Sequence, residues 1–312
     1  MKIYSFLDEF YSSIPCILTI GIFDGVHLGH KKIIQNLVFE SRKKFSSVLI
    51  TFNPHPKEIL TSKSKFYYLN TIREKIFFLK KNGVENLIIH PFTKKFSKLK
   101  MKDFFYLFLN TKFCIKKIII GYDFHIGSDR NQSLKRLKNL SEIFHFKFEI
   151  ISPYKMDNEI ISSTKIKNSI IIGNIEWANK ALGYFYTLSG YIIKGKGIGK
   201  IIDFPTSNIT IDPKKLIPKK GVYAVKIRYK NNYYDGMMNI GTNPTIDYNN
   251  QIKIETNIFN FSKNIYGEKI DILIIKMIRE EIKFSSIEEL KIQIIKDKKV
   301  IVKFFKKIFQ NL

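Results

Sequence analysis

The chain has 312 residues, which is long enough for two ordinary domains that each bury a hydrophobic core. Hydrophobic residues make up 45% of the sequence and aromatic residues 14%, a composition that excludes a largely disordered chain. There are 53 lysine and arginine residues against 27 acidic residues, so the formal net charge is +26.

So large a positive charge is typical of proteins that bind nucleic acids. Here the basic residues are mostly lysine, they are spread along the chain, and isoleucine, asparagine, phenylalanine and tyrosine accompany them. AT-rich codons encode this set of residues, and no nucleic-acid-binding motif accompanies the charge. We therefore attribute the charge to genome composition and expect no nucleic-acid partner.

Cysteine content and hydropathy point to the cytoplasm. The two cysteines, Cys16 and Cys114, have neither metal-ligand spacing nor a disulfide framework, so we expect free thiols. The amino-terminal segment lacks the apolar core of a signal peptide. No apolar run approaches the length of about eighteen residues that a membrane-spanning helix needs. We expect a soluble protein with no membrane partner.

In the first half of the chain, short apolar runs alternate with segments of helical periodicity. The expected strands are residues 16–21, 46–52, 86–90, 116–121 and 146–151. The expected helices are residues 30–44, 71–82, 101–110 and 132–144. This alternation is typical of βαβ units that build a parallel sheet, whose ligand binds at the carboxyl ends of the strands.

The pattern changes after about residue 184. Short strands with Asp-Gly and Asn-Pro pairs between them are expected at residues 187–195, 221–241, 252–259 and 269–278. They predict a mostly antiparallel barrel or sandwich. A closing helix follows a capping box formed by Ser286 and Glu289. We therefore predict two domains, residues 1–184 and residues 185–312.

The first candidate site is the loop that follows the first expected strand. Gly21, Gly25 and Gly29 allow tight turns and a close approach of the backbone to a phosphate. His27 and His30 are three residues apart, so both can face one ligand at a helix amino terminus, where free N–H groups favour anions. Two imidazoles that donate to phosphate oxygens would stabilise charge on an α-phosphate during adenylyl transfer. Zinc binding would need a third ligand at suitable spacing, which the sequence lacks.

A cluster of hydroxyl and ammonium groups precedes a later helix, in the segment ISSTKIK. Ser162, Ser163 and Thr164 are good helix-capping residues, and taken alone the cluster would have only that role. Together with the loop that contains His27 and His30, which we call the histidine loop, these hydroxyls and Lys165 become candidate partners for the β- and γ-phosphates of ATP.

The second domain has a glycine-rich loop of its own, which contains Gly195 and Gly199. Its backbone N–H groups would surround phosphates. Thr206 and Asn208 follow on an extended segment, two residues apart, so their side chains point to one face. A hydroxyl and an amide there would hold Mg²⁺ and the phosphates of ATP. Taken alone, the segment is equally compatible with an ordinary glycine hairpin.

Glu255 lies in an expected strand, IKIETNIF. A carboxylate beside a bound polyol chain would accept the proton of its terminal hydroxyl as that oxygen attacks the γ-phosphate of ATP. Most glutamates at such a strand position are simply exposed to solvent and have no catalytic role. The catalytic interpretation therefore depends on the motifs around it.

Four motifs of the first half, GIFDGVHLGH, TFNPHP, GYDFHIG and ISSTKIK, resemble in order those of the bacterial bifunctional riboflavin kinase/FAD synthetase family. The corresponding module of that family is a Rossmann-like nucleotidyltransferase. The resemblance implies that His27 and His30 bind ATP phosphates, and that Asn53 and Asp123 line a pocket shared by the nucleotide and FMN. Further ATP contacts are implied for Gly21, Phe23, Gly29, Ser163, Thr164 and Lys165.

The motifs DFPTSN, KGVYAVKI, MNIGTNPT and IETNIFNFSKNIYG, with the segment from Arg279 onward, resemble in order the riboflavin kinase module of the same family. By this resemblance Glu255 is the catalytic base, and Arg279 and Glu281 belong to the flavin-side lip. The implied contacts to Mg-ATP are Gly195, Gly199, Thr206 and Asn208, with Thr206 on the metal. The two resemblances together cover residues from about 15 to about 300.

The chain departs from the family's usual residues at several matched positions. Lys165 and Lys167 replace arginines, which keeps the charge but loses the bidentate geometry. Other differences are His125, Ile126, Lys200, Asp203, Asn243, Asn257 and Asn260. None of them is the proposed base or a proposed magnesium residue.

The sequence thus predicts phosphorylation of riboflavin to FMN and adenylylation of FMN to FAD, each with Mg-ATP. Two alternatives stay open. One is a riboflavin kinase whose adenylylation has decayed, which Lys165 and Lys167 keep possible. The other is a protein that binds flavins or RNA without turnover.

Overall fold

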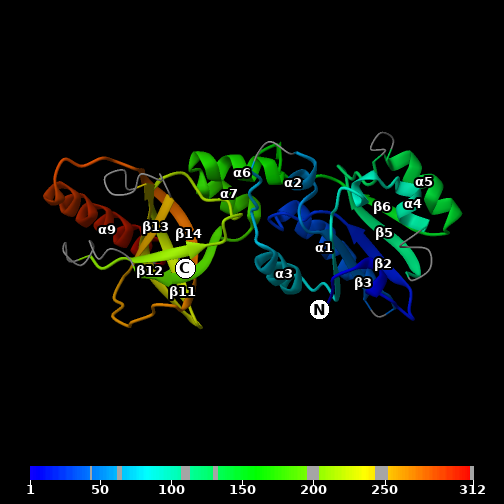
Figure 1. Cartoon of the computed structure of the whole chain (residues 1–312), viewed down its shortest axis with the longest axis horizontal. Coiled ribbons are helices and arrows are strands. Elements are labelled where there is room, and N and C mark those ends of the chain that lie inside the picture. Colours follow the sequence, from blue (N-terminus) through cyan, green and yellow to red (C-terminus); the bar gives the residue numbers. More distant parts are fainter. Residues whose placement is uncertain are drawn as a thin grey trace. The chain divides into compact units, whose positions relative to one another are not determined.

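The computed structural model describes residues 1–42, 44–61, 65–106, 113–128, 133–194, 204–242 and 252–309; for 308 and 309 only the backbone is described. The chain divides into two compact units, Met1–Ser163 and Thr164–Leu312. They are coloured from blue to green and from green to red in Figure 1. The boundary predicted after residue 184 follows the change in sequence pattern, and it stays a prediction.

The first unit is built on a six-stranded parallel sheet in the order β1-β4-β3-β2-β5-β6. The strands are β1 (Lys2–Tyr4), β2 (Cys16–Ile20), β3 (Ser46–Phe52), β4 (Asn86–His90), β5 (Ile115–Gly121) and β6 (Lys147–Ile151). Every residue of β2 and β3 is buried. Central strands of a parallel sheet consist mostly of apolar residues because both faces of the sheet are covered.

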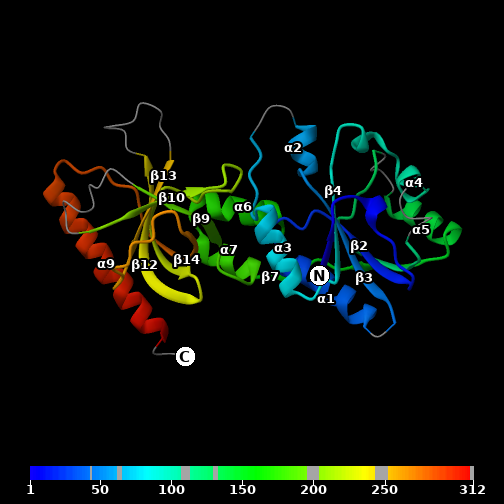
Figure 2. The same cartoon turned by 60° about the horizontal axis from the view of Figure 1, so that its bottom comes forward.

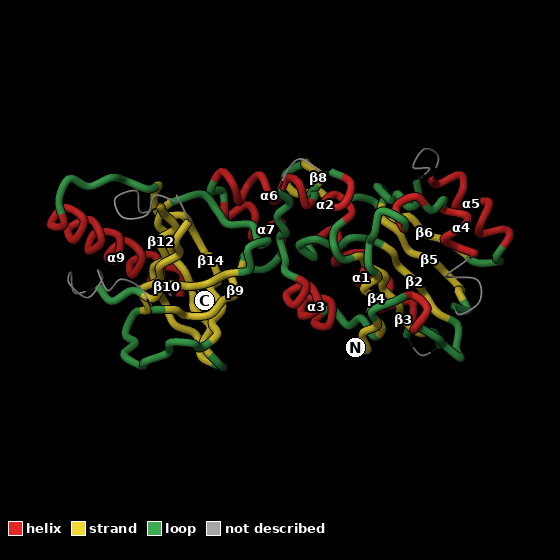
Figure 3. The backbone as a smooth tube through the Cα atoms, in the orientation of Figure 1, coloured by secondary structure: helices red, strands yellow, loops and turns green. Residues whose placement is uncertain are grey.

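Helices cover the two faces of this sheet in two groups (Figure 3). The helices of the unit are α1 (Leu28–Ser41), α2 (Pro56–Leu60), α3 (Ile72–Lys81), α4 (Met101–Phe104) and α5 (Ser133–Ile143), of which α2 buries none of its residues. Ile34 of α1 and Leu79 of α3 pack with Leu49 and Ile119 on one face. Phe104 of α4 and Leu137 of α5 belong to the core on the other face.

The order of the strands creates a topological switch point between β2 and β5. From β2 the chain continues to β3 and β4 on one side, and then returns to β5 on the other side of β2. In open parallel sheets, ligands bind at the carboxyl ends of the strands at such a point. The histidine loop follows β2 directly, so it lies at this position.

The second unit contains a closed six-stranded barrel in the order β10-β13-β12-β11-β14-β9, in which all pairs are antiparallel (Figure 2). The strands are β9 (Thr187–Ile193), β10 (Ser207–Ile211), β11 (Gly221–Tyr229), β12 (Asn232–Thr242), β13 (Ile252–Ile258) and β14 (Lys269–Glu280). Closure leaves no unpaired edge strand.

Three helices accompany the barrel. α6 (Ser163–Ile172) and α7 (Ile175–Leu182) precede it, and the Nδ2 of Asn179 in α7 donates to the Ile274 carbonyl of β14 at 2.9 Å. α9 (Ile287–Phe309) packs Ile301 and Phe305 against the barrel. Its start differs in detail from the prediction. Ser286 Oγ does accept from the N–H of Glu289, but the Glu289 carboxylate accepts from Ser285 N–H, one residue further out.

The predicted fold class is confirmed: an α/β unit with a parallel sheet, then a mostly antiparallel barrel with a carboxyl-terminal helix. The sequence patterns missed several elements: β1, the helices α2 and α7, and a hairpin of β7 (Lys155–Met156) and β8 (Glu159–Ile160). Across the described ranges, none of the helices combines the length and the apolar character needed to cross a membrane.

Candidate active sites

A hollow of about 80 Å³ lies at the switch point of the first unit. It is lined by residues that follow β2, β5 and β6, together with the residues at the start of α6. Five predicted site residues line it: His27, Gly29, His30, Asp123 and Ser163. The structure therefore brings together residues from three separate sequence motifs.

His27 is the N-cap of α1, and its Nδ1 accepts from the backbone N–H of His30 at 3.3 Å. The two imidazoles stack, with ring centroids 3.7 Å apart and planes 18° apart. This contact leaves little room at Gly29, where a Cβ would lie 3.1 Å from Cε1 of His27. Since Nδ1 of His27 is an acceptor, the proton of the neutral ring lies on Nε2.

Both histidines are neutral at physiological pH. Burial lowers the pKa of His27 to about 4, against a smaller opposing effect of Asp24. Burial also holds the pKa of His30 well below its usual value, and the neighbouring His27 and Lys75 act in the same direction. Among the described residues, the buried Nδ1 of His30 has no hydrogen-bond partner. The Nδ1 of His30 can therefore form a hydrogen bond with a ligand at the switch point, where an anion is expected.

Several buried polar contacts brace the loop between β2 and α1. Lys75 of α3 is 3% exposed, and its Nζ donates to the carbonyl of Ile22 at 2.7 Å. The carboxylate of Asp24 accepts from the N–H groups of Leu69 at 2.9 Å and of Asn70 at 3.3 Å. The loop is therefore held by the segment that leads into α3. None of these contacts was predicted.

Strain in this loop is visible in its backbone. Phe23 has a φ of 51° and Val26 a φ of 37°, both unusual for residues other than glycine. Such conformations persist only where the surroundings over-determine them, and they are common at functional sites. Phe23 is 2% exposed, with its ring against Gly21 and 5.2 Å from the His30 ring. Phe23 therefore packs between Gly21 and the His30 ring.

The remaining predicted residues of the first site lie near the carboxyl edge of the sheet or at the start of α6. Ser163 Oγ donates to the backbone carbonyl of Asp24 at 2.9 Å, so Ser163 itself is held against the loop that carries His27 and His30. Thr164 and Lys165 follow in the first turn of α6, where both are exposed. Asn53 directly follows β3 and is exposed, but it is not among the residues that line the hollow.

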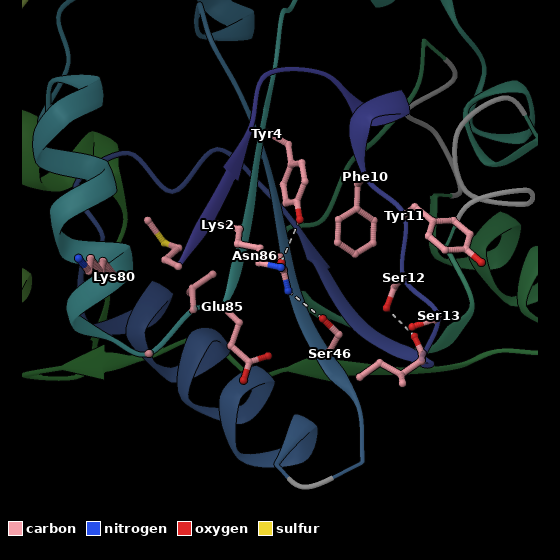
Figure 4. A pocket seen from close by; sticks show the side chains of 14 residues that line it. Lys2, Tyr4, Phe10, Tyr11, Ser12, Ser13, Ser46, Lys80, Glu85 and Asn86 are labelled. Atoms are coloured by element: carbon pink, nitrogen blue, oxygen red, sulfur yellow. Dashed lines mark hydrogen bonds between the residues drawn. The ribbon is translucent and has the colours of Figure 1, made fainter.

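A larger cavity, about 720 Å³, lies at the opposite edge of the sheet (Figure 4). Its polar side chains largely satisfy one another. Asn86 donates to Ser46 Oγ at 2.8 Å and accepts from the Tyr4 hydroxyl at 3.4 Å, and Ser12 Oγ donates to the carbonyl of Ile14. Since the cavity lies at the amino ends of the strands, the smaller hollow is the better candidate despite its size.

In the barrel, Asn208 and Glu255 lie directly opposite each other on the neighbouring strands β10 and β13. Directly paired residues of antiparallel strands have side chains on the same face, with Cβ atoms about 5 Å apart. Burial raises the pKa of Glu255, and Lys253 partly opposes this effect. A raised pKa makes the carboxylate a stronger base.

The segment before β10 is fixed by a contact from β13. The Nδ2 of Asn257 donates to the carbonyl of Pro205 at 2.8 Å. Thr206 follows directly and is half-buried. Asn257, one of the positions that depart from the family's usual residues, thus holds this segment in place through its amide. Gly195 and Gly199, like Lys200, Asp203 and Asn243, lie outside the described residues.

Arg279 and Glu281, the two predicted lip residues, both have partners within the unit. Arg279 of β14 binds Asp297 of α9, with Nε at 3.0 Å and Nη2 at 2.8 Å from Oδ2. Asp297 is 3% exposed. Glu281 accepts from the backbone N–H of Thr242 at 3.1 Å. Within the described residues, no group of three or more histidine, cysteine or acidic side chains is arranged to hold a metal ion.

Fold and sites together define a nucleotidyltransferase unit joined to a small kinase barrel. A family model described as FAD synthetase matches residues 11–165, and one described as riboflavin kinase matches residues 182–305. The chain belongs to the family of bifunctional riboflavin kinase/FMN adenylyltransferases. This finding confirms the predicted family and the bifunctional interpretation over the two alternatives.

The relatives match over nearly their whole length. The enzyme of Buchnera aphidicola subsp. Schizaphis graminum, named bifunctional riboflavin kinase/FMN adenylyltransferase, is 40% identical over 293 residues, which are 92% of this chain and 93% of that protein. The enzyme of the same name from Escherichia coli K12 is 32% identical over 93% of both chains. A crystal structure titled macrolide-efflux protein, from Streptococcus pneumoniae, is 29% identical and has a TM-score of 0.87 over 96% of this chain and 97% of that one.

Proposed function

We propose that the barrel transfers the γ-phosphoryl group of ATP to riboflavin, and that the first unit transfers the adenylyl group of ATP to the resulting FMN. The observation that carries the first half is the direct pairing of Asn208 with Glu255 across β10 and β13. It places an amide for ATP beside a carboxylate whose pKa is raised. We assign both reactions to the cytoplasm.

In the kinase reaction, Glu255 accepts the proton of the 5′-hydroxyl of riboflavin as that oxygen attacks the γ-phosphorus. The bond from the γ-phosphorus to the bridging oxygen breaks, and ADP leaves. The Gly195 and Gly199 backbone would surround the phosphates. Arg279 and Glu281 act at the flavin-side lip, Arg279 through its position between β14 and α9.

Mg²⁺ fits the donors present beside Glu255. Thr206 and Asn208 offer neutral oxygen atoms, the ligand type that Mg²⁺ prefers, and this ion commonly takes one or two protein ligands together with phosphate oxygens. We assign Thr206 to the metal and Asn208 to the metal-bound ATP. When bound, the ion neutralises charge that develops on the transferred phosphoryl group.

In the adenylyl reaction, a phosphate oxygen of FMN attacks the α-phosphorus of ATP and pyrophosphate leaves. The neutral His27 and His30 donate hydrogen bonds to phosphate oxygens, where charge develops. The Gly21 and Gly29 backbone, with the Phe23 ring packed against Gly21, shapes the loop that approaches the phosphates. Ser163, Thr164 and Lys165 bind the β- and γ-phosphates, and Asn53 and Asp123 line the pocket for nucleotide and FMN.

Two variants separate the two halves of this proposal. Glu255→Gln keeps the size of the side chain but removes the base, so FMN formation from riboflavin should fall at least a hundredfold. FAD formation from supplied FMN should stay unchanged. His30→Ala should instead lower FAD formation from FMN and leave FMN formation from riboflavin unchanged. Both are measured by resolving riboflavin, FMN and FAD chromatographically after incubation with Mg-ATP, and near-normal FMN formation by Glu255→Gln would refute the assignment of the base.

A further inference from the structure

A third polar residue, Asn239, lies in line with Asn208 and Glu255 across three neighbouring strands. β13 pairs with β10 so that Glu255 is opposite Asn208, and it pairs with β12 so that Glu255 is also opposite Asn239. Since paired residues share a face of the sheet, the three side chains form a row that crosses the strands. Glu255 occupies its centre.

The row lies on the outer face of the barrel. The residues on either side of Asn239, Met238 and Ile240, are fully buried, whereas Asn239 itself is exposed. The same alternation holds on β13, where Ile254 and Thr256 are buried on either side of Glu255. Successive residues of a strand point to opposite faces, so Asn239 has no place in the barrel core.

Asn239 is also close to a second carboxylate. A Cβ atom at Gly241 would lie 2.5 Å from Oε1 of Glu281 and 3.4 Å from Nδ2 of Asn239. The absence of a side chain at Gly241 therefore leaves room for the carboxylate of Glu281 on the same side of β12 as the amide of Asn239. The side chain of Asn239 is exposed and is paired with Glu255 across the strands, so a ligand that contacts this carboxylate can reach the amide.

We propose that Asn239 is a specificity-determining residue of the kinase site, whose amide binds the secondary 4′-hydroxyl of the substrate's polyol chain. This inference rests on the proposed kinase function. The 4′-hydroxyl is adjacent to the reacting 5′-hydroxyl, so it lies beside Glu255 when the 5′-hydroxyl faces that carboxylate. An amide donates and accepts, which matches a hydroxyl, and it leaves the proton transfer to Glu255. The site thereby selects for a polyol rather than a simple terminal alcohol.

The test compares riboflavin with 4′-deoxyriboflavin as substrates of the full-length protein. The wild-type enzyme should show a kcat/KM about tenfold lower for the deoxy compound, the effect of one lost hydrogen bond. Asn239→Ala should lower kcat/KM for riboflavin about tenfold and leave the two substrates nearly equal. The matched control is Asn232→Ala, an exposed asparagine at the other end of β12, which should keep the wild-type preference.

A second variant tests the position of the residue independently. Asn239→Asp puts a like charge opposite Glu255, which disfavours the ionised base and should move the acidic limb of the kcat/KM profile to higher pH. The proposal would be overturned if the acidic limb of Asn239→Asp stayed where it is in the wild-type enzyme. It would also be overturned if Asn239→Ala still preferred riboflavin over 4′-deoxyriboflavin by the wild-type factor. Failure of the kinase function itself would look different, because Glu255→Gln would then also phosphorylate riboflavin normally.

Discussion

The Nζ of Lys75 donates to the backbone carbonyl of Ile22 at 2.7 Å, although 53 residues separate them. Thr51 Oγ1 donates to the same carbonyl at 3.0 Å. Both contacts end on the loop that carries the histidine pair. A buried ammonium group thus fixes the strand-to-helix turn from the side of α3, while its charge helps to keep His30 neutral.

Replacing Lys75 by methionine should separate the two activities. The substitution keeps the apolar stem but leaves the Ile22 carbonyl with one donor fewer, a loss of about 2 kcal/mol for a bond to a charged group. We expect FAD formation from FMN to fall at least tenfold while FMN formation is unchanged. Lys80→Met, on the exposed side of the same helix, is the control and should affect neither rate. Equal rates for the two variants would show that the turn does not depend on Lys75.

The depressed pKa of His27 makes stability depend on pH. The pKa is about 4 in the folded protein against a usual value of 6.5, so protonation favours the unfolded chain. The free energy of unfolding is therefore highest above about pH 6.5 and decreases as the pH falls towards 4, by about 2 kcal/mol at pH 5.

His27→Asn removes this titration but keeps an N-cap acceptor. Guanidinium unfolding followed by circular dichroism at neutral pH and near pH 5 should show a smaller loss for the variant than for the wild-type protein. Identical losses would mean that His27 does not titrate in this range.

The acidic limb of the kinase reaction should depend on Lys253. Glu255 acts as a base only when ionised, and burial raises its pKa whereas Lys253 lowers it. Lys253→Met removes the favourable charge, so the limb of the kcat/KM profile for riboflavin should move to higher pH, with the plateau rate retained. Lys269→Met, an exposed lysine at the start of β14, should leave the limb in place. A limb that moves to lower pH in Lys253→Met would contradict the electrostatic assignment.

The ion pair between Arg279 and Asp297 should contribute to the stability of the barrel unit. Asp297 is buried and also accepts from Gln293 Nε2 at 2.8 Å. Asp297→Asn leaves the guanidinium without its counter-charge, which we expect to cost about 3 kcal/mol. Calorimetry should show a lower midpoint for the barrel, and kinase activity should be lost at a lower temperature than adenylylation. Glu288→Gln, at an exposed position of α9, should cause neither change.

Local patterns were sufficient to predict the elements that carry both sites. β3 and β4 have the predicted bounds because each has an apolar centre, residues 48–50 and 87–89, typical of a buried strand. The three residues of β1 were missed, since so short a strand has no periodicity of its own. His27, His30 and Glu255 could be proposed from the sequence because each stands within a contiguous motif.

Contacts between distant residues were the part that the sequence did not reveal. Asn239 belongs to a recognised motif, but its place opposite Glu255 follows only from the pairing of β12 with β13. The partner of Arg279 is on another element, 18 residues away. One signal was available for Lys75, because it lies on the face of α3 that also buries Leu79, where helical periodicity expects an apolar side chain.

The row formed by Asn208, Glu255 and Asn239 makes β13 sensitive to insertions and deletions, and not only to substitutions. A slip of one residue against its neighbours would turn Ile254 and Thr256 outward and bring Glu255 into the barrel. The inner face would then hold a charge without a partner, and the outer face would have no base. We therefore expect conservative substitutions at exposed positions of this strand to be tolerated more readily than insertions or deletions within it.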